Sequence, residues 1–311
     1  AETERILQEG KAKLIIGAYQ SSVSKPTSFV TERNQFPFLC AVSSSAALTE
    51  RGMKYFFRVA PTDFHDARMF FNFLEDMRAQ GRDVERIAMV YEKTEFGIHA
   101  MKEVKKRIDD SGGAYKLVAN VPYEYKATDV NAEALKVKAA KPDVIIHASL
   151  FSEMMLFAKA YKNLGVTTNA NLSFCGGYQN PKFASGLGDT VEGYMGSCTF
   201  AADFIEKKAQ LKTINDMYKA KTDMNLDGIS MEAFTTLFVA ADAFQRAQDL
   251  SPKAVRDALA KTELEIATMP GKGVKFDENG QNIWIASTMS QIQDTDYKVV
   301  WPQEWRSEEH T

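Results

Sequence analysis

The sequence predicts a doubly wound α/β fold, in which parallel strands alternate with helices. Short apolar runs such as IAMVY (residues 87–91) and DVIIHASL (143–150) are typical of strands buried on both faces of a sheet. Segments with the apolar periodicity of helices separate these runs along the first two thirds of the chain. The length of 311 residues is enough for one large domain or two ordinary ones.

The expected elements follow one another in a regular order up to residue 199. Strands are expected at 14–19, 36–40, 55–59, 86–91, 116–122, 144–148, 172–175 and 194–199. Helices are expected between them at 23–33, 63–80, 95–110, 130–139 and 153–163. The first ten residues, AETERILQEG, form a further expected helix that ends at Gly10. Because an α/β domain rarely begins on such a helix, we expect a strand upstream of it.

The pattern changes after residue 199. Helical periodicity dominates at 203–218, 230–248 and 252–261, and the stretch 273–302 has the pattern of β-structure with two turns. The sequence contains no internal repeat and no linker rich in glycine and serine. Two lobes would therefore be joined by ordinary strand-to-helix crossovers.

The composition excludes several classes of protein. Hydrophobic residues make up 45% and charged residues 25% of the chain, with a formal net charge of −3, which is typical of a globular protein and not of a nucleic-acid binder. No apolar run reaches the roughly 18–20 residues of a membrane span, and no signal peptide is evident. Cys40, Cys175 and Cys198 are odd in number, so we expect buried free thiols and not a fully paired disulfide framework.

The sequence contains no complete motif for a dinucleotide cofactor, a metal or a catalytic nucleophile. The glycines of GLGDTVEG (186–193) are misplaced for a dinucleotide loop, and the sequence has no H-x-x-x-H, C-x-x-C or G-x-S-x-G motif. DMNLDG (223–228) copies the start of a calcium loop, but Phe234 stands where the bidentate glutamate belongs. His147 lies in an apolar strand and is expected to be a core residue. We therefore expect no cofactor, no metal and no catalytic residue.

Two serine clusters follow neighbouring strands. Ser21 and Ser22 in GAYQSSVSKP (17–26) begin a helix, and three serines in CAVSSSAALTERG (40–52) follow the next strand. Hydroxyls and the N–H groups of a first helical turn favour a carboxylate or a phosphate. Each cluster alone could be an ordinary helix cap. Together, on consecutive strands, they favour a small anion site.

Several stretches resemble the solute-binding proteins of branched-chain amino-acid ABC transporters, which are type I periplasmic binding proteins. The similar stretches are LIIGAYQSSVSKP, PFLCAVSSSAALTERGMKYFFRVAPTD, IAMVYEKTEFG and GKGVKFDENGQN…QIQDTDYKVVWP. The resemblance implies two doubly wound, Rossmann-like lobes joined by three crossovers, with a ligand cleft between them. It places residues 1–60 and 200–282 in the first lobe, 61–199 and 283–305 in the second, and 306–311 in a tail.

The resemblance also implies a set of ligand-binding residues. In the first lobe they are Ser21, Ser22, Val42, Ser43 and Ser44, which would hold the ligand carboxylate. In the second lobe they are Phe96, Ser149, Leu150 and Tyr178, which would line the cleft and select the ligand's tail.

Two departures from the family pattern affect the expected ligand. The N-terminal strand, helix and strand of the family are absent from this sequence, which would remove part of the first lobe. In the turn where amino-acid binders carry a glutamate for the α-ammonium, this chain has CGGYQNP (175–181), and we match Tyr178 to the glutamate. A buried ammonium without a carboxylate partner is costly. We therefore expect a carboxylate without an amine, with a hydrophobic or aromatic tail.

The function that the resemblance implies is capture of a small carboxylate for an ABC importer by closure of two lobes. The expected partners are that ligand and a membrane permease, with no nucleic acid and no membrane insertion. The protein would be monomeric, without enzymatic activity, and periplasmic or extracellular and tethered to a membrane. The alternatives are a binder of a hydrophobic or branched-chain amino acid, a ligand sensor, and an α/β enzyme built on the same plan.

Overall fold

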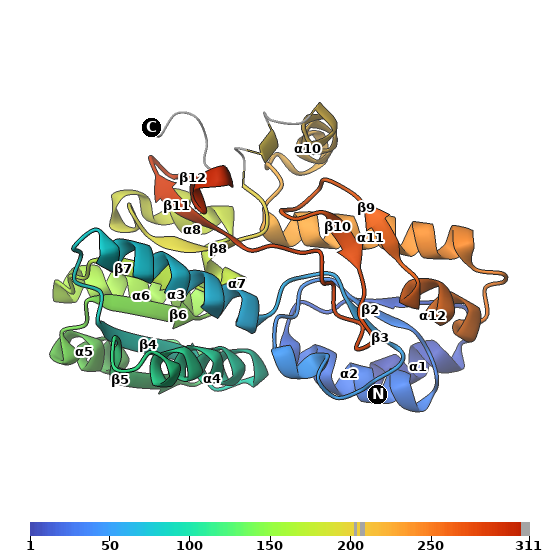
Figure 1. Ribbon diagram of the computed structural model, residues 1–311, viewed down its shortest axis with the longest axis horizontal. Helices are drawn as coiled ribbons and strands as arrows, with labels where there is room; N and C mark the ends of the chain where they lie inside the picture. The colour runs from blue at the N-terminus through green and yellow to red at the C-terminus, as the bar shows by residue number, and fades with distance from the viewer. Residues whose placement is uncertain (202–203, 206–208, 306–311) are drawn as a thin grey trace. The chain divides into compact units, whose positions relative to one another are not determined.

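Contacts within the chain divide it into two compact units, coloured by residue number in Figure 1. The computed structural model describes residues 1–201, 204–205 and 209–305. Unit 1 comprises Ala1–Thr62 and Ile229–Ala286, and unit 2 comprises Asp63–Gly228 and Ser287–Thr311, so the chain passes three times from one unit to the other. The described residues of 200–228, expected in the first lobe, group here with unit 2, and residues 61–62 and 283–286, expected in the second lobe, group with unit 1. The expected tail at 306–311 lies outside the described residues.

Unit 1 contains a three-stranded parallel sheet in the order β1-β2-β3. Its strands are β1 (Ile15–Ile16), β2 (Phe38–Cys40) and β3 (Phe56–Arg58). Its helices are α1 (Glu2–Gln8), α2 (Ser21–Arg33), the short 3-10 helix η1 (Ala46–Leu48), α11 (Gly228–Arg246) and α12 (Pro252–Ala260). A separate antiparallel pair joins β9 (Glu263–Glu265) to β10 (Gly273–Lys275), and β9 was not expected from the sequence.

Aromatic residues form the core of the small sheet in unit 1. Phe38 and Phe56 are buried on neighbouring strands, with their ring centroids 5.2 Å apart in an edge-to-face arrangement. Leu48 of η1 and Met53 pack against them. The burial of these side chains removes apolar surface from water and holds the segment between β2 and β3 against the sheet.

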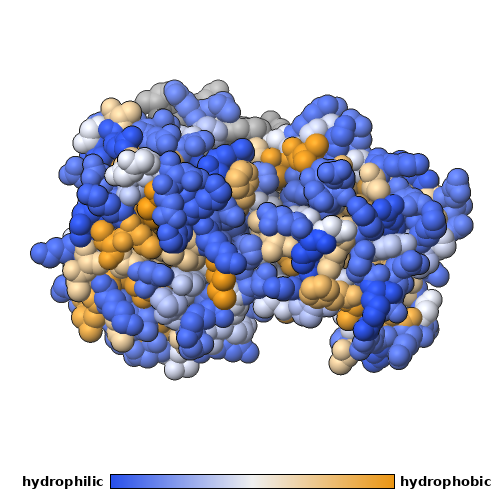
Figure 2. All heavy atoms as spheres, turned by 60° about the horizontal axis from the view of Figure 1, so that its bottom comes forward, coloured by the Kyte–Doolittle hydropathy of each residue, from blue (hydrophilic) through white to orange (hydrophobic). Residues whose placement is uncertain are grey.

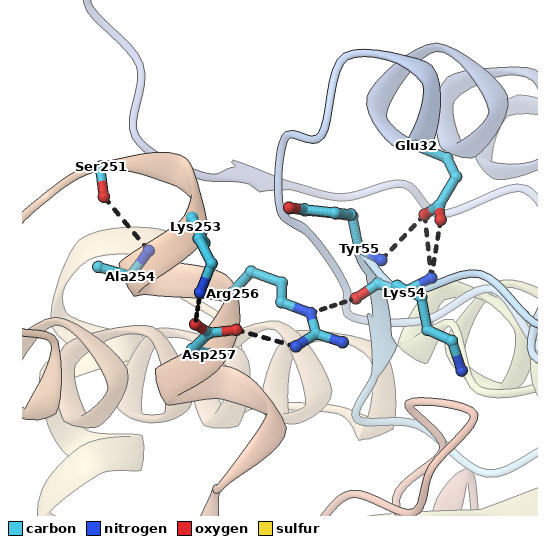
Figure 3. Close-up of polar contacts among 8 residues, drawn as sticks. All are labelled: Glu32, Lys54, Tyr55, Ser251, Lys253, Ala254, Arg256 and Asp257. Atoms are coloured by element: carbon cyan, nitrogen blue, oxygen red, sulfur yellow. Dashed lines mark hydrogen bonds and ion pairs between the residues drawn. The ribbon is translucent and has the colours of Figure 1, made fainter.

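Two helices hold the chain just before β3 (Figure 3). The Glu32 carboxylate of α2 accepts the backbone N–H groups of Lys54 and Tyr55, each at 2.9 Å. From α12, Arg256 donates through Nε to the Lys54 carbonyl oxygen at 2.8 Å. These bonds tie the chain at the start of β3 to α2 and α12.

Unit 2 is built on a seven-stranded sheet in the order β12-β11-β8-β7-β6-β4-β5. The five strands from β8 to β5 in this order run parallel to one another. β11 is antiparallel to both of its neighbours, β12 and β8. The strands are β4 (Arg86–Glu92), β5 (Lys116–Tyr123), β6 (Val144–Ala148), β7 (Ala170–Ser173), β8 (Met195–Cys198), β11 (Thr288–Gln293) and β12 (Asp296–Trp301). The helices are α3 (Asp63–Ala79), α4 (Glu95–Asp110), α5 (Asn131–Ala140), α6 (Phe151–Leu164), α7 (Cys175–Tyr178), α8 (Pro181–Leu187) and α10 (Ala209–Thr222), with η2 (Gly188–Thr190) and η3 (Gln303–Trp305).

Alternate residues of β4 face different helix layers in unit 2. Ile87 and Met89 pack in a core with residues of α3 and α4. Ala88 and Val90 pack in a second core with residues of α5 and α6. This period of two in a strand with both faces covered is the doubly wound arrangement that the continuous apolar runs predict.

The fold confirms several expectations and corrects one element. All three cysteines are free and buried, and His147 is fully buried with its Nε2 at 3.2 Å from the Tyr161 hydroxyl. The strand expected at 172–175 ends at Ser173, and the segment after it forms the short helix α7. Part of the helix expected at 203–218 lies outside the described residues, and α10 begins at Ala209.

Hydrophilic residues predominate on the face drawn in Figure 2, where apolar residues form separate patches. Among the described helices, none combines the length and the apolar character that a membrane crossing requires.

Candidate functional site

The two serine segments of unit 1 lie together in the structure. Because β1 and β2 are parallel neighbours, the segments that follow them leave the same edge of the sheet. The Ser43 hydroxyl donates to the Ala18 carbonyl oxygen at 2.9 Å, and the backbone N–H of Ser45 donates to Ser21 Oγ at 3.2 Å. We call residues 43–45 the serine turn. Its contacts with the start of α2 make one polar group from two segments about 25 residues apart in sequence.

The expected residues of unit 1 differ in exposure. Ser21 is the first residue of α2 and is buried, whereas Ser22 beside it is exposed. Val42, Ser43 and Ser44 are buried between β2 and η1. The residue before α2 is Gln20, a type that caps helices poorly.

Sequence reasoning missed Ser24 and Arg58 at this site. Ser24 is fully buried, and its Oγ lies 2.8 Å from Ser43 Oγ. Its spacing of three residues from Ser21, which places both on one helix face, was the available signal. Arg58 is fully buried at the end of β3. The available signal for it was a charged residue directly after two phenylalanines in the strand FFR.

Arg58 contacts the serine turn directly. Its Nη1 donates to the Ser43 carbonyl oxygen at 3.0 Å and to the Ser45 carbonyl oxygen at 2.6 Å. Its Nη2 donates to Thr49 Oγ1 at 2.7 Å, and its Nε donates to Gln281 Oε1 at 2.7 Å. A buried guanidinium with bonds on all three nitrogens is held in one orientation.

Three of the four expected residues of unit 2 meet around the first turn of α7. A methyl group added at Gly176 would lie 2.7 Å from the Ser149 carbonyl oxygen, 3.4 Å from the Phe96 ring and 3.5 Å from the Leu150 side chain. The backbone N–H of Gly177 donates to the same Ser149 oxygen at 2.8 Å. Phe96 and Ser149 are buried, and Leu150 is partly exposed.

Tyr178 lies elsewhere, in the core of unit 2. Its hydroxyl donates to the Ser290 carbonyl oxygen at 2.9 Å, and its ring meets that of Tyr297 edge-on at 5.2 Å. Met154 and Phe183 pack in the same apolar cluster. The ring is fully buried among residues of its own unit and offers no face to a ligand, so we do not retain Tyr178 as a ligand contact.

A buried carboxyl that the sequence did not single out lies near the start of α4. Glu92 ends β4 and is 2% exposed, and the Thr94 hydroxyl donates to its Oε1. Within the described part of the chain, no group hydrogen-bonds to Glu92 Oε2. The pKa of Glu92 is raised to about 7, mainly by burial; the Thr94 hydrogen bond opposes this shift and the neighbouring carboxylate of Glu153 contributes to it. Glu153 is itself buried and accepts the Lys126 N–H at 2.7 Å.

Over residues 1–201, 204–205 and 209–305, no three side chains of histidine, cysteine, aspartate or glutamate come together as a metal site would require. The groups gathered at the serine turn are hydroxyls, peptide groups and one guanidinium. Such groups bind anions, and they include no nucleophile paired with a base.

Comparison with known proteins identifies the family. A family model described as periplasmic binding protein matches residues 1–295. Leu/Ile/Val-binding protein homolog 7 of Brucella abortus is 25% identical over 314 residues, covering 97% of this chain and 77% of that protein.

Solved structures show the same fold at low sequence identity. A leucine binding protein, LivK, from Thermotoga maritima has a TM-score of 0.83 at 19% identity, covering 96% of this chain and 81% of its own. An ABC transporter solute binding protein from R. palustris, in complex with benzoate, has a TM-score of 0.81 at 14% identity, with 96% and 79% covered. The fold is that of type I periplasmic binding proteins, and the chain belongs to the periplasmic binding protein family.

Proposed function

We propose that this chain is the solute-binding component of an ABC importer and binds a small carboxylate with a hydrophobic or aromatic tail. The observation that carries this proposal is the joining of two serine segments at one edge of the unit 1 sheet. The named relatives support it, because leucine, isoleucine, valine and benzoate all combine a carboxylate with an apolar body. The binding is non-catalytic, and the protein passes its ligand to a membrane permease.

The carboxylate is held by hydroxyl and peptide donors of unit 1. Ser21 Oγ accepts the Ser45 N–H, so its own O–H remains able to donate to a ligand. Ser44 adds a second hydroxyl and a peptide N–H in the serine turn. Hydrogen bonds to an ionised acceptor are about twice as strong as neutral ones, which favours a carboxylate over an uncharged group.

Two serine variants test the carboxylate site. Ser21→Ala and Ser44→Ala should each weaken binding by about 1–3 kcal/mol, the range for hydrogen bonds to charged groups. Titration calorimetry with benzoate and with leucine measures this. Ser185→Ala in α8 of unit 2, an exposed serine bonded to its own helix, is the matched control and should leave affinity unchanged. Unchanged affinity in both site variants would contradict the proposal.

The amine of the ligand decides between two candidate functions. The turn at 175–181 contains no acidic residue, which favours an amine-free carboxylate, with Phe96 as the remaining aromatic contact. The buried carboxyl of Glu92 is a specific observation in favour of the second candidate, a binder of a hydrophobic or branched-chain amino acid.

A thermal-shift screen separates the two candidates. Benzoate and phenylpropanoate should stabilise the protein more than leucine, isoleucine or valine. Stabilisation by the amino acids alone would establish the second candidate. In that case Glu92→Gln should abolish the shift with leucine if Glu92 pairs with the ammonium. Chemical turnover of any of these acids would instead favour an enzyme.

A periplasmic location, or an extracellular one with a membrane tether, and a monomeric state belong to the same proposal. Closure of two lobes around the ligand is its mechanical part. The three passages of the chain between units, at 62–63, 228–229 and 286–287, are where such a movement would turn. Small-angle scattering should give a smaller radius of gyration at ligand saturation, and identical curves would count against closure.

A further inference from the structure

We propose that Arg58 makes the serine turn selective for carboxylates, by orienting its peptide groups and supplying a positive charge behind them. The inference rests on the proposed function, since it concerns the same carboxylate site. Arg58 is a positioning residue here, because it acts on the ligand through the turn.

The two bonds from Arg58 Nη1 set the direction of two peptide groups. In a trans peptide the carbonyl and the following N–H point in opposite directions. The Ser43 carbonyl oxygen lies 3.0 Å from Nη1, which directs the N–H of Ser44 away from the guanidinium. The Ser45 carbonyl oxygen lies 2.6 Å from the same nitrogen, which directs the N–H of Ala46 away likewise. Both N–H donors therefore point to the side of the turn opposite Arg58.

The guanidinium is fixed at both of its other nitrogens. Nη2 donates to Thr49 Oγ1 and Nε donates to Gln281 Oε1, each at 2.7 Å. Gln281 is anchored in turn, because its Nε2 donates to the Ala60 carbonyl oxygen at 3.1 Å. The backbone N–H of Arg58 also donates to the Gly280 carbonyl oxygen at 2.8 Å. The turn is thus held in place before a ligand arrives, which reduces the ordering cost of binding.

The charge of Arg58 adds to this orientation. A guanidinium does not lose its proton in proteins, and Arg58 is fully buried, where screening by water is weak. Its field polarises the two peptides so that their N–H ends become better donors to an anion. An uncharged amide could use the same N–H groups but would gain nothing from the charge. The acid form of a ligand should therefore bind more tightly than its amide.

A matched pair of variants at Thr49 isolates the effect of the Arg58 charge on ligand binding. Thr49→Asp places a carboxylate next to Arg58 Nη2, whereas Thr49→Asn has the same shape without the charge. Calorimetry would compare benzoate with its uncharged amide, benzamide. Benzoate should bind Thr49→Asp about tenfold more weakly than Thr49→Asn, and benzamide should bind the two variants equally.

Each outcome decides the inference. Equal acid affinities for the two Thr49 variants, or equal losses for acid and amide, would overturn it while the proposed function stands. Failure of the unchanged protein to bind any carboxylate would overturn both. If Thr49→Asp does not fold, Arg58→Lys and Arg58→Met replace the pair, and the lysine should retain more of the preference for acid over amide.

Discussion

The two units differ in how they accommodate a buried ionisable side chain. In unit 1 the Arg58 guanidinium is fully buried and donates on all three nitrogens to carbonyl, amide and hydroxyl oxygens. In unit 2 the Asp66 carboxyl is almost as deeply buried, with the Ser287 hydroxyl donating to it at 2.8 Å. Burial raises the pKa of Asp66 to about 6, so the carboxyl tends toward its neutral form. Arg58 of unit 1 therefore keeps its charge, which neighbouring oxygens solvate, whereas the pKa of Asp66 in unit 2 is shifted toward the neutral form.

In two more residues of unit 2, burial shifts the pKa in the direction that favours the neutral form. Burial raises the pKa of Glu92 to about 7 and lowers that of His147 to about 3. His147 is neutral above that pH, and its ring nitrogens lie 3.3 Å from Ser149 Oγ and 3.2 Å from the Tyr161 hydroxyl. The permanent charge of Arg58, held by four acceptors, lies in unit 1 next to the serine turn.

The largest effect is expected when the buried charge of unit 1 is removed. Arg58→Met removes the guanidinium donor from the Ser43 and Ser45 carbonyl oxygens and from the Gln281 amide oxygen, and of these the Ser45 oxygen keeps the Leu48 N–H at 3.1 Å. We expect a loss of about 3–5 kcal/mol in the free energy of unfolding, measured by urea denaturation. Arg256→Met is the control, because that partly exposed arginine bonds the Lys54 carbonyl oxygen and the Asp257 carboxylate, and its loss should cost about 1 kcal/mol. Similar losses in the free energy of unfolding for the two variants would show that the buried arginine stabilises the protein no more than the partly exposed one.

The sequence predicted the elements that carry a clear periodic signal. The limits of α4 and β6 match the expected ranges, because each has a continuous pattern with a definite start and end. β9 was missed, since Glu263–Glu265 is a short, mostly exposed strand with one central leucine and no apolar run. α7 was missed because two adjacent glycines predict a turn, whereas here they allow close backbone packing.

The parts of the site that come directly after strands in the sequence could be predicted. The parts whose surroundings are formed by residues far away in the sequence could not. The serine segments are local features, and the parallel pairing of β1 and β2 brings them together. The environment of Arg58 depends on Gln281, 223 residues further along the chain. The surroundings of Tyr178 were unpredictable for the same reason, since its hydroxyl partner Ser290 lies 112 residues away. Nothing near Tyr178 in sequence indicates that the core of unit 2 covers its ring.

A second prediction concerns close packing in unit 2. Gly177→Ala would place a methyl group 2.6 Å from the Leu150 carbonyl carbon and 2.8 Å from the Phe151 N. Both are backbone atoms that cannot rotate away, so we expect a loss of about 1–3 kcal/mol in the free energy of unfolding. The control is Gly186→Ala in α8, where the nearest atom is the flexible end of Met155 at 3.5 Å. A stable Gly177→Ala protein would show that α7 can move away from Leu150.

The smallest effect, and the most direct test of the comparison, is a pH dependence carried by Asp66. Its pKa is raised by burial from 3.8 to about 6, so between these values the folded protein holds a proton that the unfolded chain has released. Stability contributed by this group therefore falls as the pH rises from about 4 through 6. Asp66→Asn removes this titration and keeps an oxygen that can accept the Ser287 hydroxyl. Between pH 5 and pH 8 the unchanged protein should lose about 1–1.5 kcal/mol relative to Asp66→Asn, measured by urea denaturation at each pH. Ser287→Ala sharpens the test, because it removes a hydrogen bond that lowers the pKa of Asp66 and should make the decline steeper. A constant difference between the unchanged protein and Asp66→Asn across this range would mean that unit 2 holds Asp66 charged, as unit 1 holds Arg58.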